Sequence, residues 1–223
     1  MQARYLRNVP ALSEKECALL GAKRVAVIGC GGLGGHIIEL LARVGVGYIK
    51  AVDGDVFEPS NLNRQLFSEP WVLGKSKART ARNRIEWVNP DIEVEAVEAF
   101  LTEENALDIV SGCDVVMDAL DNVSARRVLS RACEKSGIPY VYGAISGWVA
   151  QCAVSMPGDG LIEKLFGAEP EITDKSVLSF TPALCAAMQC ALCVKLLCGR
   201  KLETGQIYYS DLLNMEFENI SII

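Results

Sequence analysis

Three charged side chains are of the types that bind a nucleoside triphosphate and its metal ion. Arg64 lies in an irregular segment after an apolar strand, Lys77 lies near the start of a helix, and Asp121 follows another apolar strand, which ends near Asp118. Guanidinium and ammonium groups bind phosphates, and a carboxylate binds Mg²⁺. Because ligands of open α/β sheets bind at the carboxyl ends of strands, the order of these residues predicts a triphosphate site. Any one of them taken singly would be read as a solvated charge.

A glycine-rich turn joins the first apolar strand to a helix with apolar residues at helical spacing. Its glycines are Gly29, Gly31, Gly32 and Gly34. Gly29 permits a tight turn, Gly31 lets the backbone approach a phosphate, and Gly34 lets the helix pack against the strand. Asp53, about 20 residues further on, lies where a Rossmann protein holds a ribose hydroxyl. An NAD-dependent oxidoreductase would share these features, so the turn predicts a nucleotide without choosing which one.

Alternating strands and helices must position these groups. The pattern predicts strands at residues 23–28, 48–53, 92–97, 114–119 and 139–143. It predicts helices at residues 32–44, 74–88, 102–110 (capped by Thr102) and 123–136. Such an order is typical of an α/β fold, a Rossmann-like doubly wound sheet that is mostly parallel.

The remaining segments extend this nucleotide-binding half in both directions. An N-terminal arm and helix, with a capping box that begins at Ser13, occupies residues 1–22, and the nucleotide-binding half occupies 23–145. In the C-terminal extension, 146–223, a strand at 150–156 precedes a crossover loop at 157–180, and an apolar helix from Pro182 ends at Gly199. Two final strands, 207–209 and 215–222, are expected to be antiparallel. We expect a single domain over residues 1–223.

Composition excludes several classes of protein. The formal net charge of −6 argues against a general nucleic-acid binder, and no N-terminal stretch has the pattern of a signal peptide. The most apolar run, residues 181–198, contains Gln189 and Lys195 and is short for a membrane span, so a buried helix is expected. We therefore expect a cytoplasmic protein that binds neither nucleic acid nor membrane.

Five motifs together resemble the ThiF/MoeB/HesA family, bacterial relatives of the ubiquitin-activating enzymes, and ThiF most of all. They are Gly29-x-Gly-Gly-Leu-Gly34, Asp53-x-Asp55, Asn61-Leu-Asn-Arg64-Gln65, Gly74-Lys-x-Lys77 and Asp118-x-x-Asp121-Asn122. The resemblance implies an ATP-dependent adenylyltransferase. Its substrate would be the C-terminal Gly-Gly carboxylate of a ubiquitin-like sulfur-carrier protein, in thiamine, molybdopterin or related sulfur-transfer biosynthesis. The products would be an acyl-adenylate and pyrophosphate.

The resemblance also implies roles for single residues. The residues implied to bind the nucleotide are Gly29, Gly31, Gly32, Gly34, Asp53, Asp55, Asn61, Arg64, Gln65, Lys77, Asp121 and Asn122. Among them, Arg64 and Lys77 would bind the phosphates and Asp121 would coordinate Mg²⁺. Arg7 would act in trans, in the site of a neighbouring subunit, which implies a homodimer with two composite sites.

The sequence departs from that family in two respects. Many members hold a structural zinc with two Cys-x-x-Cys pairs, whereas residues 158–161 and the last residues of this chain contain no cysteine, so we expect no zinc. Cys190-Ala-Leu-Cys193 lies in the apolar helix, and we interpret it as part of the core. Some relatives have a crossover-loop cysteine that links covalently to the carrier. Asp174 lies near that position here, and we expect the enzyme to stop at the acyl-adenylate.

Other functions stay open at this stage. One is an NAD-dependent oxidoreductase, another is a non-catalytic partner of an activating enzyme, and a third is adenylation of a peptide or tRNA-linked group by the same chemistry. Retention of Arg64, Lys77 and Asp121 argues against the non-catalytic partner.

Overall fold

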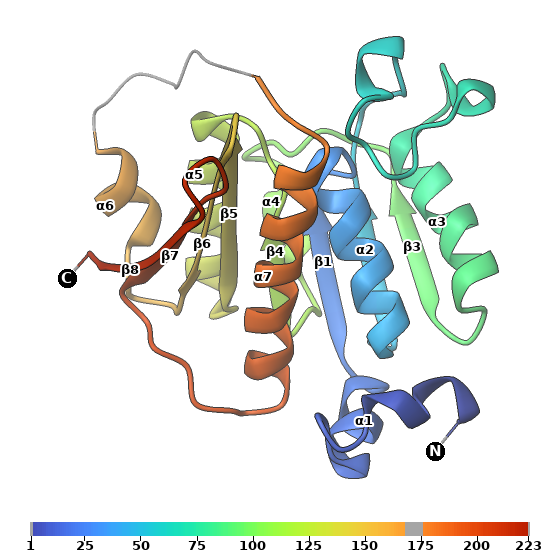
Figure 1. Cartoon of the computed structure of the whole chain (residues 1–223), viewed down its shortest axis with the longest axis horizontal. Coiled ribbons are helices and arrows are strands. Elements are labelled where there is room, and N and C mark those ends of the chain that lie inside the picture. The colour runs from blue at the N-terminus through green and yellow to red at the C-terminus, as the bar shows by residue number, and fades with distance from the viewer. Residues whose placement is uncertain (1, 168–175, 223) are drawn as a thin grey trace.

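The structure is a computed structural model that describes residues 2–167 and 176–222. These residues form one mixed sheet of eight strands with helices on both faces. The strand order is β3-β2-β1-β4-β5-β6-β7-β8. The first five strands in this order are parallel, and β6, β7 and β8 are added antiparallel (Figure 1). The strands are β1 Arg24–Ile28, β2 Tyr48–Val52, β3 Glu93–Val97, β4 Val115–Asp118, β5 Tyr140–Ser146, β6 Val149–Ser155, β7 Gln206–Asp211 and β8 Glu216–Ser221. This sheet confirms the predicted fold class.

Helices cover both faces of the sheet, as a doubly wound fold requires. On one face lie α2 (Gly32–Val44), α3 (Lys77–Val88) and α7 (Phe180–Leu197). On the other lie α4 (Ala106–Val110), α5 (Val123–Ser136) and α6 (Leu161–Phe166). A 3-10 helix, Ala3–Asn8, and α1 (Glu14–Leu20) lie below the start of β1 (Figure 1). The carboxyl ends of the parallel strands therefore point away from the N-terminal arm.

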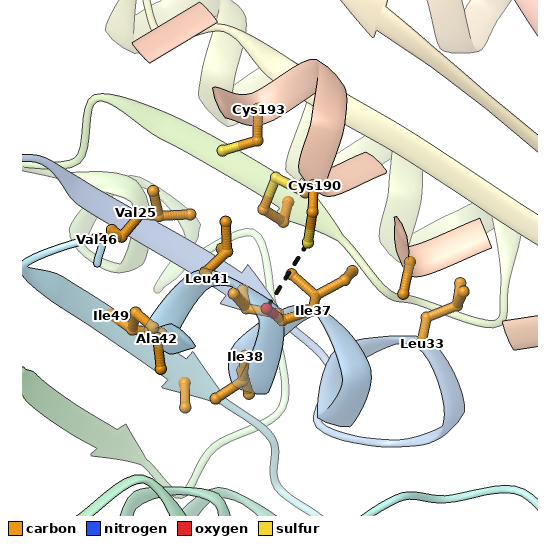
Figure 2. Close-up of a cluster of buried hydrophobic side chains, with 14 of the residues drawn as sticks. Val25, Leu33, Ile37, Ile38, Leu41, Ala42, Val46, Ile49, Cys190 and Cys193 are labelled. Atoms are coloured by element: carbon orange, nitrogen blue, oxygen red, sulfur yellow. Dashed lines mark hydrogen bonds between the residues drawn. The ribbon is translucent and has the colours of Figure 1, made fainter. Parts of the chain in front are cut away.

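Cysteines help to fill the core between α2 and α7. Cys190 and Cys193 of α7 face Leu33, Ile37 and Leu41 of α2 (Figure 2), and the Cys190 thiol donates to the Ile37 carbonyl oxygen at 3.8 Å. Seven of the nine cysteines are buried, and burial raises the pKa of the Cys190 thiol well above its ordinary value. The interpretation of the Cys-x-x-Cys pair as core residues is confirmed.

The helix α7 is long and apolar enough, by length and composition, to cross a membrane. Half of its most apolar stretch is buried inside the protein, against α2 and against β4, β5 and β6. Its central polar residue, Gln189, is fully buried and hydrogen-bonds to the backbone of the sheet. A core helix passes the same test as a membrane span, and the packing identifies α7 as a core helix.

Several element boundaries differ from those predicted. Thr102 does not cap α4, because the Asn105 side chain bonds both the Thr102 amide and the Phe100 carbonyl and closes a turn before the helix begins at Ala106. β5 is longer than predicted because it continues through a hairpin and pairs with β6. The range given to the crossover loop contains α6, where the sequence indicates a turn of helix around Glu163, and α7 begins at the last residue of the range, Phe180. Asp174 lies outside the described residues.

Close packing of backbone on backbone explains Gly34. Gly29 has a left-handed φ of +98°, and a Cβ atom at Gly34 would lie 1.8 Å from the Gly29 carbonyl oxygen. We expect Gly34→Ala to lower the free energy of unfolding by about 3 kcal/mol or more, measured by urea denaturation. The matched control is Gly35→Ala one residue later, where the new Cβ would lie no closer than 3.5 Å to its neighbours and alanine favours the helix by about 1 kcal/mol. Equal denaturation midpoints for the two variants would contradict this explanation.

A capping box begins α1, as predicted, and an ion pair extends it. Ser13 N donates to the Glu16 carboxylate at 2.7 Å, and Arg200 donates to both of its oxygens at 2.6 and 2.9 Å. The hydrogen bonds from Arg200, followed by those from Ser13, lower the pKa of Glu16 from 4.5 to about 2.

Because the pKa of Glu16 falls on folding, its stabilising effect is complete above pH 4.5 and is lost as the pH falls through about 2. We expect the backbone amides of α1 to lose protection from hydrogen exchange over this pH range in the native protein, as measured by NMR. The loss should be smaller in Glu16→Gln. Glu14→Gln, on the same helix, is the matched control and should titrate like the native protein. A Glu16→Gln protein with the native acid profile would count against this assignment.

Candidate functional site

A cavity of about 670 Å³ lies at the carboxyl ends of β1, β2 and β4. The strand order reverses direction between β1 and β4, and this crevice is where ligands bind in open α/β sheets. Ten predicted site residues line it: Gly29, Gly31, Gly32, Asp53, Asp55, Arg64, Gln65, Lys77, Asp121 and Asn122. The structure thus brings together residues that are spread over more than 90 positions of the sequence.

The glycine turn forms the floor of the cavity at the N-terminus of α2. Gly31 is the N-cap residue of this helix, and no side chain caps it, so the first amides of α2 are available to an anion. Gly34 packs against the turn and does not line the cavity. Asp53 stabilises the turn: one carboxylate oxygen accepts from Cys30 N at 2.7 Å, and the other accepts from Asp55 N at 2.8 Å. Each oxygen keeps a lone pair for a ligand hydroxyl.

Lys77 is held at the cavity wall by an ion pair. Its ammonium lies 2.6 Å from an Asp55 carboxylate oxygen, and its backbone amide donates to the Asp55 carbonyl at 3.0 Å. The lysine is only 6% exposed. Partial burial would raise the pKa of Asp55, but hydrogen bonds from Lys77 and Val56 outweigh it and hold that pKa below its ordinary value. Asp55 is therefore charged at neutral pH and holds the Lys77 side chain at the cavity wall.

Arg64 presents a positive charge that neutral groups hold in place. Its guanidinium donates to the Ser60 carbonyl and to Asn63 Oδ1, both at 2.8 Å. Among the ion pairs of residues 2–167 and 176–222, none involves Arg64. Next to it, the buried Gln65 amide oxygen has no hydrogen-bond partner within the described chain. These two groups are available to a ligand.

Asn61 is buried behind the cavity rather than in its wall. Its side-chain oxygen accepts from Glu58 N at 3.0 Å and closes the turn Pro59–Asn61, and its backbone carbonyl accepts from the amides of Arg64 and Gln65. It is not among the residues that line the cavity. Its predicted role in nucleotide binding stays a prediction.

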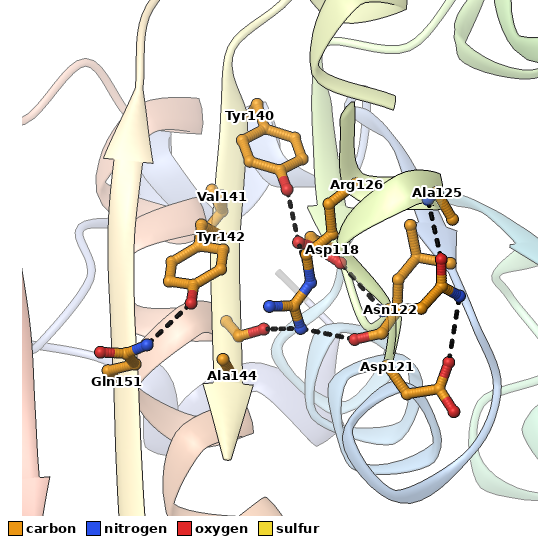
Figure 3. Close-up of polar contacts among 12 residues, drawn as sticks. Asp118, Asp121, Asn122, Ala125, Arg126, Tyr140, Val141, Tyr142, Ala144 and Gln151 are labelled. Carbon is orange, nitrogen blue, oxygen red and sulfur yellow. Dashed lines mark hydrogen bonds and ion pairs between the residues drawn. The ribbon is translucent and has the colours of Figure 1, made fainter. Parts of the chain in front are cut away.

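The two aspartates of the fifth motif, Asp118 and Asp121, point in different directions (Figure 3). Asp118 is fully buried and accepts from Leu120 N at 2.8 Å and from the Tyr140 hydroxyl, and Arg126 Nε lies 3.3 Å from it. Asp121 is exposed at the cavity, where one carboxylate oxygen accepts from Asn122 Nδ2 at 3.3 Å. Asp121 is therefore the carboxylate of this motif that a ligand or cation can reach.

Arg7 lies away from the cavity of its own chain. It is exposed in the arm, below the start of β1, whereas the glycine turn lies at the other end of that strand (Figure 1). The arm is fixed to its own subunit by Asn89, whose amide nitrogen donates to the Tyr5 hydroxyl at 2.7 Å and to the Ala42 carbonyl at 2.8 Å. The structure does not bring Arg7 together with the other predicted site residues.

The cavity also contains residues that sequence reasoning missed, among them Phe100, Arg126 and Phe166. Phe100 follows β3 by three residues and lies against Gly54, so the rule that ligands bind at the carboxyl ends of strands could have found it. Arg126 lies one helical turn after Asn122, but nothing in its local sequence distinguishes it from Arg127. Phe166 ends α6, a helix that the sequence marks only weakly.

Metal-ligating side chains do not cluster in the described chain. Within residues 2–167 and 176–222, no three His, Cys, Asp or Glu side chains converge on a common point. The absence of zinc stays a prediction.

Comparisons with known proteins agree on one family. The model of the ThiF family matches residues 3–223. The SAMP-activating enzyme E1 of Haloferax volcanii is 37% identical over 207 residues, 89% of this chain and 76% of that protein. The sulfur carrier protein adenylyltransferase of Thermus thermophilus is 34% identical, over 98% of this chain and 86% of that protein. The probable adenylyltransferase/sulfurtransferase MoeZ of Mycobacterium tuberculosis is also 34% identical, and the chain covers 60% of its length.

A solved structure supports the fold. The crystal structure of E. coli MccB with ATP superposes with a TM-score of 0.84 over 100% of this chain and 72% of that chain. Sequence identity is 20%, so this likeness concerns the architecture of the chain.

Proposed function

The chain belongs to the ThiF family, and from this premise we propose that it is an ATP-dependent adenylyltransferase. It activates the C-terminal Gly-Gly carboxylate of a ubiquitin-like sulfur-carrier protein as an acyl-adenylate and releases pyrophosphate. The carrier is of the ThiS or MoaD kind and serves thiamine, molybdopterin or related sulfur-transfer biosynthesis. Relatives of this chain are named as enzymes that activate or adenylylate such carriers.

One observation carries the proposal, which is the composition of the cavity. An uncapped helix N-terminus, the guanidinium of Arg64 and the ammonium of Lys77 surround a space that Asp53 and Asp121 border. A nicotinamide dinucleotide has only two phosphates, and hydride transfer does not require a cluster of cations around them. Adenylation releases the β- and γ-phosphates of ATP as pyrophosphate, so it needs positive charge both at the α-phosphate and at the departing phosphates.

The reaction needs no general base. The nucleophile is a carboxylate that is already ionised at pH 7, and it attacks the α-phosphorus of ATP. A bond forms between the carboxylate oxygen and that phosphorus, and the bond from phosphorus to the oxygen that bridges to the β-phosphate breaks. Arg64 and Lys77 reduce the repulsion between the carboxylate and the triphosphate and stabilise the charge on pyrophosphate. Catalysis therefore consists of positioning and electrostatic stabilisation.

Asp121 fits a magnesium site. Mg²⁺ binds through one or two carboxylates together with phosphate oxygens and water, and Asp121 is an exposed carboxylate whose single described partner is the neutral Asn122 amide. Asp118 does not fit, because Arg126, Tyr140 and a backbone amide already occupy it. When bound, Mg²⁺ would supply positive charge to the phosphate oxygens.

A homodimer completes the proposal. Arg7 is exposed in the N-terminal arm, which lies at the end of the sheet opposite the glycine turn, and this placement supports a role in the cavity of another subunit. The names of the relatives of this chain support a biosynthetic role. We also propose that the protein is cytoplasmic.

ATP–pyrophosphate exchange tests the proposed function. We expect exchange with full-length carrier proteins that end in Gly-Gly and none with the same carriers shortened by the terminal glycine. Tight binding of NAD without exchange would favour an oxidoreductase. ATP binding without exchange for any Gly-Gly carrier would favour a non-catalytic partner, and exchange with a short peptide or a tRNA-linked group would favour the alternative substrates.

A further inference from the structure

Two buried side chains replace the backbone pairing between β4 and β5 where these strands approach the cavity. The ladder between them ends at Met117 and Val141. Beyond that point Arg126 donates to the Leu120 carbonyl at 2.5 Å and to the Gly143 carbonyl at 2.9 Å. The amide of Gln189 donates to the Asp118 carbonyl at 2.8 Å from the opposite face of the sheet. The backbone ladder ends here, and these three carbonyls accept hydrogen bonds from side chains instead.

The bonds of this network converge on the residue before Asp121. Leu120 N donates to the Asp118 carboxylate at 2.8 Å, and Leu120 O accepts from Arg126. Both peptide groups of Leu120 are therefore fixed. Asp121 itself has a single described side-chain bond, to the neighbouring Asn122, so the direction of its carboxylate depends on the backbone that precedes it.

Arg126 is well placed to hold this turn. It is 6% exposed, its charge is balanced by Asp118 at 3.3 Å, and its guanidinium lies over the Tyr142 ring at 5.0 Å. One planar group thereby ties α5, the end of β4 and the end of β5 together. Both carbonyls accept from one guanidinium nitrogen, Nη2, whose direction the planar group fixes. A lysine ammonium lies on a flexible stem, and no planar group fixes the direction of its bonds.

We infer that Arg126 is a positioning residue that directs the Asp121 carboxylate into the cavity through the Leu120 carbonyl. This inference rests on the proposed role of Asp121 as the magnesium ligand. Arg126 needs no contact with ATP for this role. Loss of the groups that orient a metal ligand typically weakens metal binding about 10- to 100-fold.

The Mg²⁺ dependence of ATP binding, measured by calorimetry on the full-length protein, tests the inference. We expect Arg126→Lys to raise the half-saturating Mg²⁺ concentration for ATP binding about tenfold. Arg131→Lys is the matched control, because Arg131 lies on the same helix and its ion pairs within the described chain, with Glu103 and Glu163, are exposed. A merely structural role would lower the melting temperature and leave the Mg²⁺ dependence unchanged.

A second variant keeps the test decisive if Arg126→Lys does not fold. Asp118→Asn with Arg126→Gln removes both buried charges together, which avoids an unpaired charge in the core. Glutamine cannot hold both carbonyls as the guanidinium does, so we again expect a raised Mg²⁺ requirement. A native Mg²⁺ dependence in either folded variant would overturn the inference.

Asp121→Asn separates this inference from the proposed function. If Arg126 acts through Asp121, Asp121→Asn should abolish the Mg²⁺ dependence, and adding Arg126→Lys should change nothing further. If Asp121→Asn has no effect on the Mg²⁺ dependence, the proposed metal ligand is wrong and the inference falls with it. If Asp121→Asn has this effect but Arg126→Lys has none, only the inference is overturned.

Discussion

Asp121→Ala should lower the rate of ATP–pyrophosphate exchange by about 10³-fold and leave the fold intact. The carboxylate is exposed at the cavity, and its one described bond is to the neighbouring Asn122 amide at 3.3 Å, so its removal leaves no buried group unpaired. We expect the free energy of unfolding to change by less than about 0.5 kcal/mol, as for an ordinary surface substitution. The expected loss follows from the proposed role of Asp121 as the magnesium ligand, whose removal would take positive charge away from the phosphates.

Asp108→Ala is the matched control for charge, because Asp108 is exposed on α4 and does not line the cavity. It should exchange at the native rate. Asp118→Ala should behave differently from both, since it leaves Arg126 unpaired in the core and should destabilise the protein by about 3–5 kcal/mol. Native exchange by folded Asp121→Ala would remove Asp121 from the mechanism.

Arg64→Ala should reduce exchange to a similar extent for a related reason. Its guanidinium is held by two neutral oxygens, so its positive charge is available to phosphates. Both hydrogen bonds are exposed, so the Arg64→Ala protein should stay folded. Arg82→Ala on α3, where Arg82 makes an exposed ion pair with Glu86, is the control. Loss of exchange in Asp121→Ala but not in Arg64→Ala would confine catalysis to the metal side of the cavity.

Local signals in the sequence were sufficient to predict much of the fold. The helix α5 begins and ends as predicted, because Asn122 caps its first turn and Gly137 adopts the left-handed conformation that ends it. The start of α4 was predicted wrongly because two residues compete to form the turn before it. Thr102 has the type of an N-cap residue, but the Asn105 side chain bonds to the backbone on its N-terminal side and delays the helix.

The candidate site was predictable where function depends on motif order, and less so where it depends on packing. Ten predicted residues line one cavity, and all but Arg64 and Gln65 directly follow a parallel strand or begin the helix after it. The sequence could not show that Asp118 points inward, since this depends on Arg126 and Tyr140, which approach it from another helix and another strand. Nor could the sequence show that Gln189, 71 positions after Asp118 and on α7, donates to the Asp118 carbonyl.

Mixing two inactive variants should restore activity if the protein is a homodimer with composite sites. Arg7→Ala and Asp121→Ala should each be inactive in exchange when expressed alone. In a heterodimer of the two, one cavity combines the intact Asp121 of the first chain with the intact Arg7 of the second. Random pairing after co-expression in equal amounts makes half of the dimers mixed, so about a quarter of all cavities should be active.

A second mixture distinguishes action in trans from action in cis. When a chain that carries both substitutions is co-expressed with the native chain, every mixed dimer lacks a complete cavity if Arg7 acts in trans, and again about a quarter of the cavities should be active. If Arg7 acts in its own chain, the first mixture should be inactive and the second should keep about half of its cavities. Arg7 is exposed, and the arm that carries it is fixed at the end of the sheet opposite the glycine turn, so its own cavity is out of reach. Recovery in the first mixture therefore requires a second subunit, whereas full activity of Arg7→Ala by itself would show that the arm has no part in the reaction.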